Sequence, residues 1–176
     1  MESIRELFRI GHGPSSSHTM GPRLAAEKFR SETPLAEYYR VTLFGSLAAT
    51  GKGHLTDQAI QEAFAPCLVE FIWKADEELP QHPNGLRLEA FNADDQPIGK
   101  WQGYSIGGGA IQTEGDYSSK AQVYKETSMQ EIMRLCTQSG QTFWEYVEDH
   151  EGKDIWNFLT QILKVMGSAV EKGLNT

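Results

Sequence analysis

Apolar and polar residues alternate in several segments of the first two thirds of the chain, which is typical of strands that bury one face. Residues 38–48 alternate in the run YYRVTLFGSLA and predict the first strand. Residues 86–111 alternate on both sides of the polar turn ADDQP and predict a hairpin. Residues 122–126, with the sequence QVYKE, are a candidate for one further strand.

Helical signals lie between these segments. Pro22 suits the first turn of a helix that is predicted to begin there, and Thr56 can cap a second helix. Despite an interruption near Pro66, residues 57–78 are predicted to be mainly helical. Residues 2–8 fit either a short helix or an edge strand.

The last part of the chain has a different character. From Ser128 only helical signals remain, so a boundary is predicted near residue 126. Apolar residues recur there at helical spacing and form a stripe that something must cover: Ile155, Leu159, Ile162, Met166 and Val170. We therefore predict an α+β fold, with helices on a largely antiparallel sheet in residues 1–126 and a helical extension in residues 127–176.

The bulk composition narrows the function classes. A chain of 176 residues can form one domain with a sizeable core, and its formal net charge of −8 offers no basic stripe to a nucleic acid backbone. The N-terminal MESIRELFRI is charged where a signal peptide needs an apolar core, and no apolar run has membrane-spanning length. We expect a cytoplasmic protein that binds neither nucleic acid nor membrane. Cys67 and Cys136 indicate neither a disulfide framework nor a metal site.

The most unusual segment is GHGPSSSHTMGP, residues 11–22, where hydroxyl side chains gather just ahead of a predicted helix. A helix N-terminus carries partial positive charge and unpaired N–H groups, so hydroxyl donors there can hold an anion such as a carboxylate. The candidate donors are Ser15, Ser16, Ser17 and Thr19. The alternative, which spacing alone favours, is a turn that caps only its own helix. A Ser17–His18 nucleophilic pair is disfavoured because neighbouring side chains are expected to point apart.

The segment FGSLAATGKGHLTD differs from a phosphate-binding P-loop in two ways. Five residues separate Gly45 from Gly51 where that loop needs four. Lys52 is followed by Gly53 where the loop needs Ser or Thr. The residue of chemical interest in this segment is then His54, which lies between a strand and a helix, where a neutral imidazole suits a general base. Lys52 could pair with a substrate carboxylate. The alternative is a surface histidine in a loop.

The third motif, YSIGGGAI, places Gly107, Gly108 and Gly109 at a strand end. Such glycines let the backbone approach a ligand closely, although a β-bulge or a sharp turn explains them equally well. The other histidines, His12, His82 and His150, show no pattern that distinguishes them from surface residues.

Together, GHGPSSSHTMGP, FGSLAATGKGHLTD and YSIGGGAI, in this order and at these separations, resemble the N-terminal β domain of the bacterial iron-sulfur-dependent L-serine dehydratases, or L-serine ammonia-lyases. The resemblance covers the whole chain. It implies a fold like the allosteric substrate-binding domain of some phosphoglycerate dehydrogenases. It also implies a lyase of amino-acid metabolism and gluconeogenesis that converts L-serine to pyruvate and ammonia.

The resemblance also implies roles for particular residues. His54 in GKGH would be the base that removes the α-proton, and the hydroxyls of SSSHT would hold the carboxylate of L-serine. A four-iron four-sulfur cluster would act as Lewis acid on the serine hydroxyl. The expected substrate-binding residues are Ser15, Ser16, Ser17, His18, Thr19, Lys52, Gly107, Gly108 and Gly109.

The cluster cysteines of that family lie in a C-terminal domain, and Cys67 and Cys136 do not match them. We therefore expect this chain to form one wall of the active site, to be inactive alone, and to need a cluster-bearing domain or subunit that covers the apolar stripe. A homodimer is expected. One alternative is a regulatory module that binds serine or another anion without catalysis, and another is a dimerisation or interaction domain.

Overall fold

The computed structural model describes residues 1–113 and 122–175, which form two compact units. The sheet unit holds residues 11–113, and the helical unit holds residues 1–10 and 122–175. Within these ranges, no helix combines the length and the apolar character that a membrane span requires. The division of the chain near residue 126 stays a prediction.

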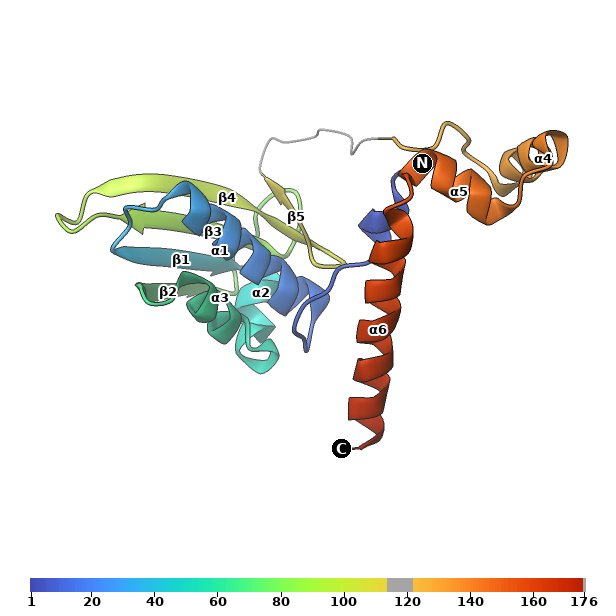
Figure 1. Cartoon of the computed structure of the whole chain (residues 1–176). Helices are drawn as coiled ribbons and strands as arrows, with labels where there is room; N and C mark the ends of the chain where they lie inside the picture. Colours follow the sequence, from blue (N-terminus) through green and yellow to red (C-terminus); the bar gives the residue numbers. More distant parts are fainter. Residues whose placement is uncertain (114–121, 176) are drawn as a thin grey trace. The chain divides into compact units, whose positions relative to one another are not determined.

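The sheet unit is built on one five-stranded sheet with the strand order β2-β1-β3-β4-β5 (Figure 1). The strands are β1 (Tyr38–Phe44), β2 (Leu68–Lys74), β3 (Gly85–Phe91), β4 (Pro97–Gly107) and β5 (Ala110–Thr113). Only β1 and β2 run parallel, and the other three neighbouring pairs are antiparallel. The predicted α+β class with a largely antiparallel sheet is confirmed, as is the hairpin of β3 and β4.

The helices of this unit are α1 (Gly21–Glu32), α2 (Gly45–Thr50) and α3 (Thr56–Phe64). Figure 1 shows α1 and α3 side by side on the sheet, where they contact each other. The alternation that predicted β1 turns one set of its side chains into the core between the two layers. The fully buried core residues include Ala26, Val41, Leu43, Leu47, Ile60, Phe64, Leu86 and Leu88.

The prediction of helix over residues 57–78 is wrong in its second half. Helix α3 ends at Phe64, and after Pro66 the chain forms β2, which pairs with β1 in the register Val41↔Phe71. Proline cannot continue the hydrogen bonding of a helix, and the run LVEFIWK has the branched and aromatic residues of a strand. The residue types of this segment and its parallel pairing with β1 therefore both favour a strand over a continued helix.

The helical unit contains the short 3₁₀ helix η1 (Ile4–Leu7) and helices α4 (Met129–Ser139), α5 (Phe143–Glu151) and α6 (Ile155–Leu174). This confirms the helical character predicted from Ser128 onward. The strand considered for residues 122–126 is limited to one antiparallel bridge between Gln122 and Glu2. Residues 2–8 are thus tied to the last third of the chain.

The apolar stripe predicted on α6 is covered only in part. Ile155 and Ile162 are buried, whereas apolar side chains from Leu163 to the end of the helix are exposed. The exposed ones include Leu163, Met166, Val170 and Leu174.

Candidate functional site

The hydroxyl-rich motif forms the start of one continuous helical segment in the sheet unit. Residues Ser16–Met20 make a π-helical turn, η2, which leads directly into α1. The Ser15 side chain caps this turn by accepting a hydrogen bond from His18 N at 3.1 Å. Pro22 lies in the first turn of α1 and has no N–H, so it cannot donate a hydrogen bond back to the preceding η2 turn. The local sequence therefore specifies an exposed helix start rich in hydroxyls.

Two threonines join this turn to the GKGH segment, which forms the 3₁₀ helix η3 (Gly51–His54). Thr19 Oγ1 donates a hydrogen bond to the carbonyl of His54 at 2.8 Å, and Thr56 Oγ1 donates to the carbonyl of His18 at 2.5 Å. Both threonines are buried. Each motif thus donates a threonine hydrogen bond to the backbone carbonyl of the histidine in the other motif. The structure therefore brings the GHGPSSSHTMGP and FGSLAATGKGHLTD motifs together.

The expected N-cap role of Thr56 is wrong, because its hydroxyl bonds to the distant His18 carbonyl. The N-cap of α3 is Leu55, whose φ of 57° is left-handed. Such a φ is uncommon for a leucine and makes a sharp turn directly after His54. The turn separates η3 from α3, so His54 is the last residue of η3 and lies just before the turn.

The rings of His18 and His54 lie side by side, with their centroids 4.9 Å apart and their planes tilted by 51°. His18 and His54 are half-buried, and Ser16, two residues before His18 in η2, is exposed. Burial, and second the charge of His54, lower the pKa of His18 below its ordinary value. His18 is therefore neutral at neutral pH.

The His18 ring lies between two serine hydroxyls. Its Nδ1 is 3.0 Å from Ser17 Oγ, and its Nε2 is 3.0 Å from Ser46 Oγ. The expectation that the Ser17 and His18 side chains point apart is wrong, because the π-helical turn places them in contact. Both ring nitrogens are occupied by hydroxyls, so no carboxylate orients His18 as in a hydrolytic triad. Ser46 lies within the FGSLAATGKGHLTD motif, but the sequence alone gives it no role, because its contact with His18 joins residues far apart in the chain.

The glycine triplet forms the turn between β4 and β5. Gly107, Gly108 and Gly109 have φ values of 97°, 57° and 73°, a left-handed run that only glycine adopts without strain. Both β4 and β5 contact η2. An ideal Cβ atom on Gly21 would lie 2.0 Å from Ser105 Oγ, so β4 passes directly against the start of α1. The third motif is therefore next to the first.

Buried polar groups lie where β4 passes the start of α1. Asn84 Nδ2 donates to the Ser105 carbonyl at 3.2 Å, and Ser105 N donates to the Asn84 carbonyl at 3.0 Å. Within the described ranges, Asn84 Oδ1 and Ser105 Oγ are buried without a hydrogen-bond partner. The His82 ring accepts a hydrogen bond from Asn84 N at 3.0 Å, so this histidine has a local structural role.

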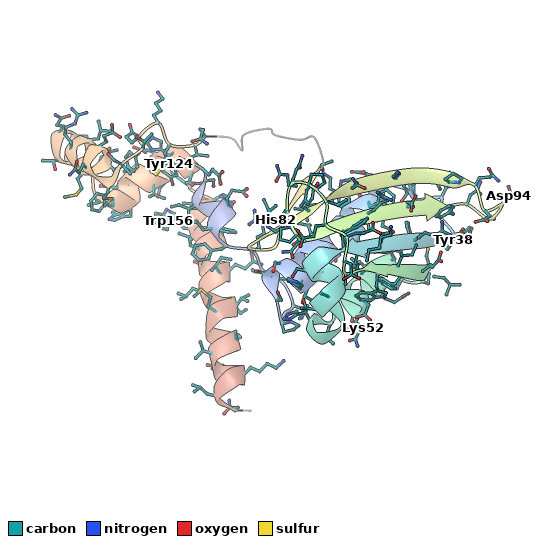
Figure 2. All side chains as sticks on the ribbon, turned by 180° about the vertical axis from the view of Figure 1, so that it is seen from behind. Tyr38, Lys52, His82, Asp94, Tyr124 and Trp156 are labelled. Carbon is teal, nitrogen blue, oxygen red and sulfur yellow. The ribbon has the colours of Figure 1, made fainter. Side chains whose placement is uncertain are left out.

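Lys52, His12 and His150 have separate surroundings. Lys52, labelled in Figure 2, is exposed. Its ammonium group lies 5.4 Å from the centroid of the Trp73 ring. A cavity of about 320 Å³ borders the site through Thr19 and Leu55 and also contacts His12. Arg23 lines this cavity too, where it forms ion pairs with glutamates of α1 and α3. His150 belongs to the helical unit, where it packs on Tyr146.

The thiols of this chain do not fit an iron-sulfur cluster. A four-iron cluster is held by four thiolates, and this chain has two cysteines. Cys67 lies in the sheet unit, with its thiol 3.6 Å from the Ala36 carbonyl, and Cys136 is buried in the core of the helical unit. In the part of the chain that the structure describes, no three His, Cys, Asp or Glu residues are arranged to hold a metal ion.

Comparison with known proteins identifies relatives that are named serine dehydratases. The family model described as serine dehydratase beta chain matches residues 3–70 and 63–116. L-serine dehydratase of Helicobacter pylori J99 is 31% identical over 85% of this chain and 43% of its own length. L-serine dehydratase 1 of Escherichia coli K12 is 30% identical over 100% of this chain and 50% of its own length. L-serine dehydratase of Mycobacterium tuberculosis is 32% identical over 76% of this chain. The chain spans about half the length of the curated relatives it matches.

Proposed function

The chain belongs to the serine dehydratase beta chain family, and on that premise we propose that it supplies one wall of the active site of an L-serine dehydratase. The reaction would convert L-serine to pyruvate and ammonia. The observation that carries the proposal is the contact between His18 and His54 at the start of a hydroxyl-rich helix. This contact supports the proposal, because it would bring a proton acceptor and an anion-binding turn within the reach of one small substrate.

We assign the proton transfer to His54. Within the described ranges, its ring nitrogens make no hydrogen bond, whereas both nitrogens of His18 contact serine hydroxyls. His54 is therefore the imidazole with a lone pair available to a ligand. It would take the α-proton of L-serine, and the electrons of that C–H bond would form the Cα=Cβ double bond as the β-hydroxide leaves. Protonation of the hydroxide gives water. The other product, 2-aminoacrylate, is an enamine, which gains a proton at Cβ and loses one from nitrogen to become the imine. Hydrolysis of that imine gives pyruvate and ammonia.

We assign the substrate carboxylate to the η2 turn. Ser16 and Ser17 carry hydroxyl groups at the first residues of the helix, where the helix dipole favours negative charge. The Ser15 hydroxyl accepts from His18 N and still has a hydrogen to donate. Thr19 differs, because its single hydrogen is directed at the His54 carbonyl, so we assign it to holding the two motifs together. The backbone of the Gly107–Gly109 turn and Lys52 are further candidates for the same anion.

The cofactor expected from the resemblance, a four-iron four-sulfur cluster, would have to take its thiolate ligands from outside this chain. Cys67 and Cys136 lie in different units and are too few to hold it. We therefore assign no step of the reaction to it and propose that a second domain or subunit completes the site. The half-length coverage of the relatives supports such a partner.

The test is steady-state kinetics of the assembled enzyme, meaning this chain together with the part that completes the length of its relatives. Ser16→Ala and Ser17→Ala should each raise the KM for L-serine, up to roughly a hundredfold, because each removes a charge-assisted hydrogen bond. Ser31→Ala is the matched control, since the Ser31 hydroxyl is exposed and donates to the Lys28 carbonyl.

Three outcomes would count against the proposal. An unchanged KM in both serine variants would refute the carboxylate site. An assembled protein without L-serine turnover would refute the enzymatic role. Binding of L-serine without turnover in that assembly would favour the regulatory module instead.

A further inference from the structure

Ser46 occupies a fixed position next to the histidine pair. It follows Gly45 at the start of α2, and its backbone N donates to the Pro83 carbonyl at 3.0 Å. Gly45 N donates to the Glu77 carbonyl at 2.8 Å, and a Cβ atom on Gly45 would approach the Pro83 carbonyl oxygen to 2.6 Å. The Ser46 hydroxyl is thus presented to His18 by a backbone that is held on both sides.

A neutral imidazole between two hydroxyls has two possible hydrogen-bond arrangements. In one, Ser46 donates to Nε2, so the proton is on Nδ1 and is donated to Ser17 Oγ. In the other, Ser17 donates to Nδ1, and the proton is on Nε2 and is donated to Ser46 Oγ. Both arrangements fit the two distances of 3.0 Å.

The two arrangements present different groups to an anion in the η2 turn. When Ser17 accepts from Nδ1–H, its own hydrogen is free to be donated to a carboxylate. When Ser17 donates to Nδ1, it offers the anion only oxygen lone pairs. An anion site that is organised before the ligand arrives therefore requires the first arrangement.

We propose that Ser46 is a positioning residue that donates to His18 Nε2, fixes the proton on Nδ1, and thereby makes Ser17 a hydrogen-bond donor to the substrate carboxylate. The choice between the two arrangements rests on the proposed function, because the distances fit both, whereas the tautomer itself can be measured without substrate. Ser46 acts through His18 and need not touch the substrate. Ser46 belongs to the FGSLAATGKGHLTD motif, in which only Lys52 and His54 have roles predicted from the sequence.

The tautomer can be measured by ¹⁵N NMR of the imidazole nitrogens in the chain without ligand. We expect the Nδ1–H form of His18 in the unmodified chain, although free histidine favours the Nε2–H form. Ser46→Ala should shift the population to Nε2–H, and Ser46→Thr, which keeps the hydroxyl, should restore Nδ1–H. Ser31→Ala should leave the His18 signals unchanged. A merely structural role of Ser46 would not produce this reversal.

Kinetics of the assembled enzyme provide the second measurement. Ser46→Ala should raise the KM for L-serine about tenfold, as expected for the loss of one directed hydrogen bond, with a much smaller change in kcat. Ser46→Thr should return KM to near the unmodified value.

The two measurements separate the possible failures. The same His18 tautomer in the unmodified chain and in Ser46→Ala would overturn the proposal, whatever the enzyme does. A tautomer that reverses while KM stays constant would overturn the link from Ser46 to the carboxylate. An assembled protein without turnover would refute the proposed function and leave the tautomer result to decide the role of Ser46.

Discussion

His18 and His54 are held in ring contact by a reciprocal pair of hydrogen bonds, in which a threonine from each motif binds the carbonyl of the other motif's histidine. The donors Thr19 and Thr56 are buried, so neither carbonyl relies on solvent for its partner. The geometry of the proposed site is therefore linked to the stability of the sheet unit.

Replacing Thr56 by Val should destabilise the sheet unit by about 1 to 3 kcal/mol, because the His18 carbonyl loses the hydrogen bond from the buried Thr56 hydroxyl while the side-chain volume is kept. Denaturant unfolding measures this loss. Thr160→Val is the control, since the exposed Thr160 hydroxyl donates within its own helix to the Trp156 carbonyl. Equal stability of the two variants would show that the cross-motif bond contributes nothing.

Gly21→Ala should destabilise the chain by about 1 to 3 kcal/mol through overpacking, because the new methyl group would collide with Ser105 Oγ. Adding Ser105→Gly should recover much of the loss, since it removes the colliding atoms. Gly53→Ala is the control, because a Cβ atom there meets nothing within 4 Å. A Gly21→Ala chain as stable as the unmodified one would contradict the close approach of β4 to α1.

The pKa of His18 should lie below 6.5 in an NMR titration, because burial and then the charge of His54 disfavour the imidazolium. His54→Gln removes the second cause and should move the pKa upward, although burial remains. Since the folded state favours neutral His18, its contribution to stability is present above pH 6.5 and is lost as the pH falls through the folded pKa. A His18 pKa that does not respond to His54→Gln would mean that the two rings are not in contact.

The helical unit should lose stability in acid through Glu151, whose side chain is 2% exposed. The carboxylate accepts hydrogen bonds from Ser3 Oγ, Ile4 N and Tyr124 Oη at 2.7, 2.7 and 2.8 Å. Burial alone would raise its pKa, but these bonds outweigh burial and lower the pKa below 4.5. The stabilisation is therefore complete above about pH 4.5 and is lost as the pH falls through the folded pKa.

Unfolding followed by circular dichroism between pH 3 and pH 7 tests this account. Glu151→Gln should be less stable than the unmodified chain at pH 7, and the difference should shrink toward pH 3. A difference that is constant over this range would show that the charge of Glu151 is not the stabilising feature.

The sequence predicted the parts of the fold that depend on local pattern. The strand predicted over residues 38–48 contains β1, although residues 45–48 belong to helix α2. The hydroxyl run and GKGH are recognisable as motifs before their contact is known. Strand β2 was missed although LVEFIWK has the branched and aromatic residues of a strand. Its side chains are mostly half-exposed, and the strand is held by parallel pairing with β1, a non-local interaction. The prediction that Thr56 caps a helix was also wrong because of a non-local interaction. Its hydroxyl bonds to the His18 carbonyl, which lies near Thr56 only in the folded chain.

The most direct test of the central claim is the turnover of L-serine by the assembled enzyme with His54→Ala. If His54 removes the α-proton, kcat should fall by about 10²- to 10⁴-fold while the KM for L-serine changes little, because a general base acts mainly in the transition state. A near-normal kcat with a raised KM would contradict the account and make His54 a substrate-binding residue.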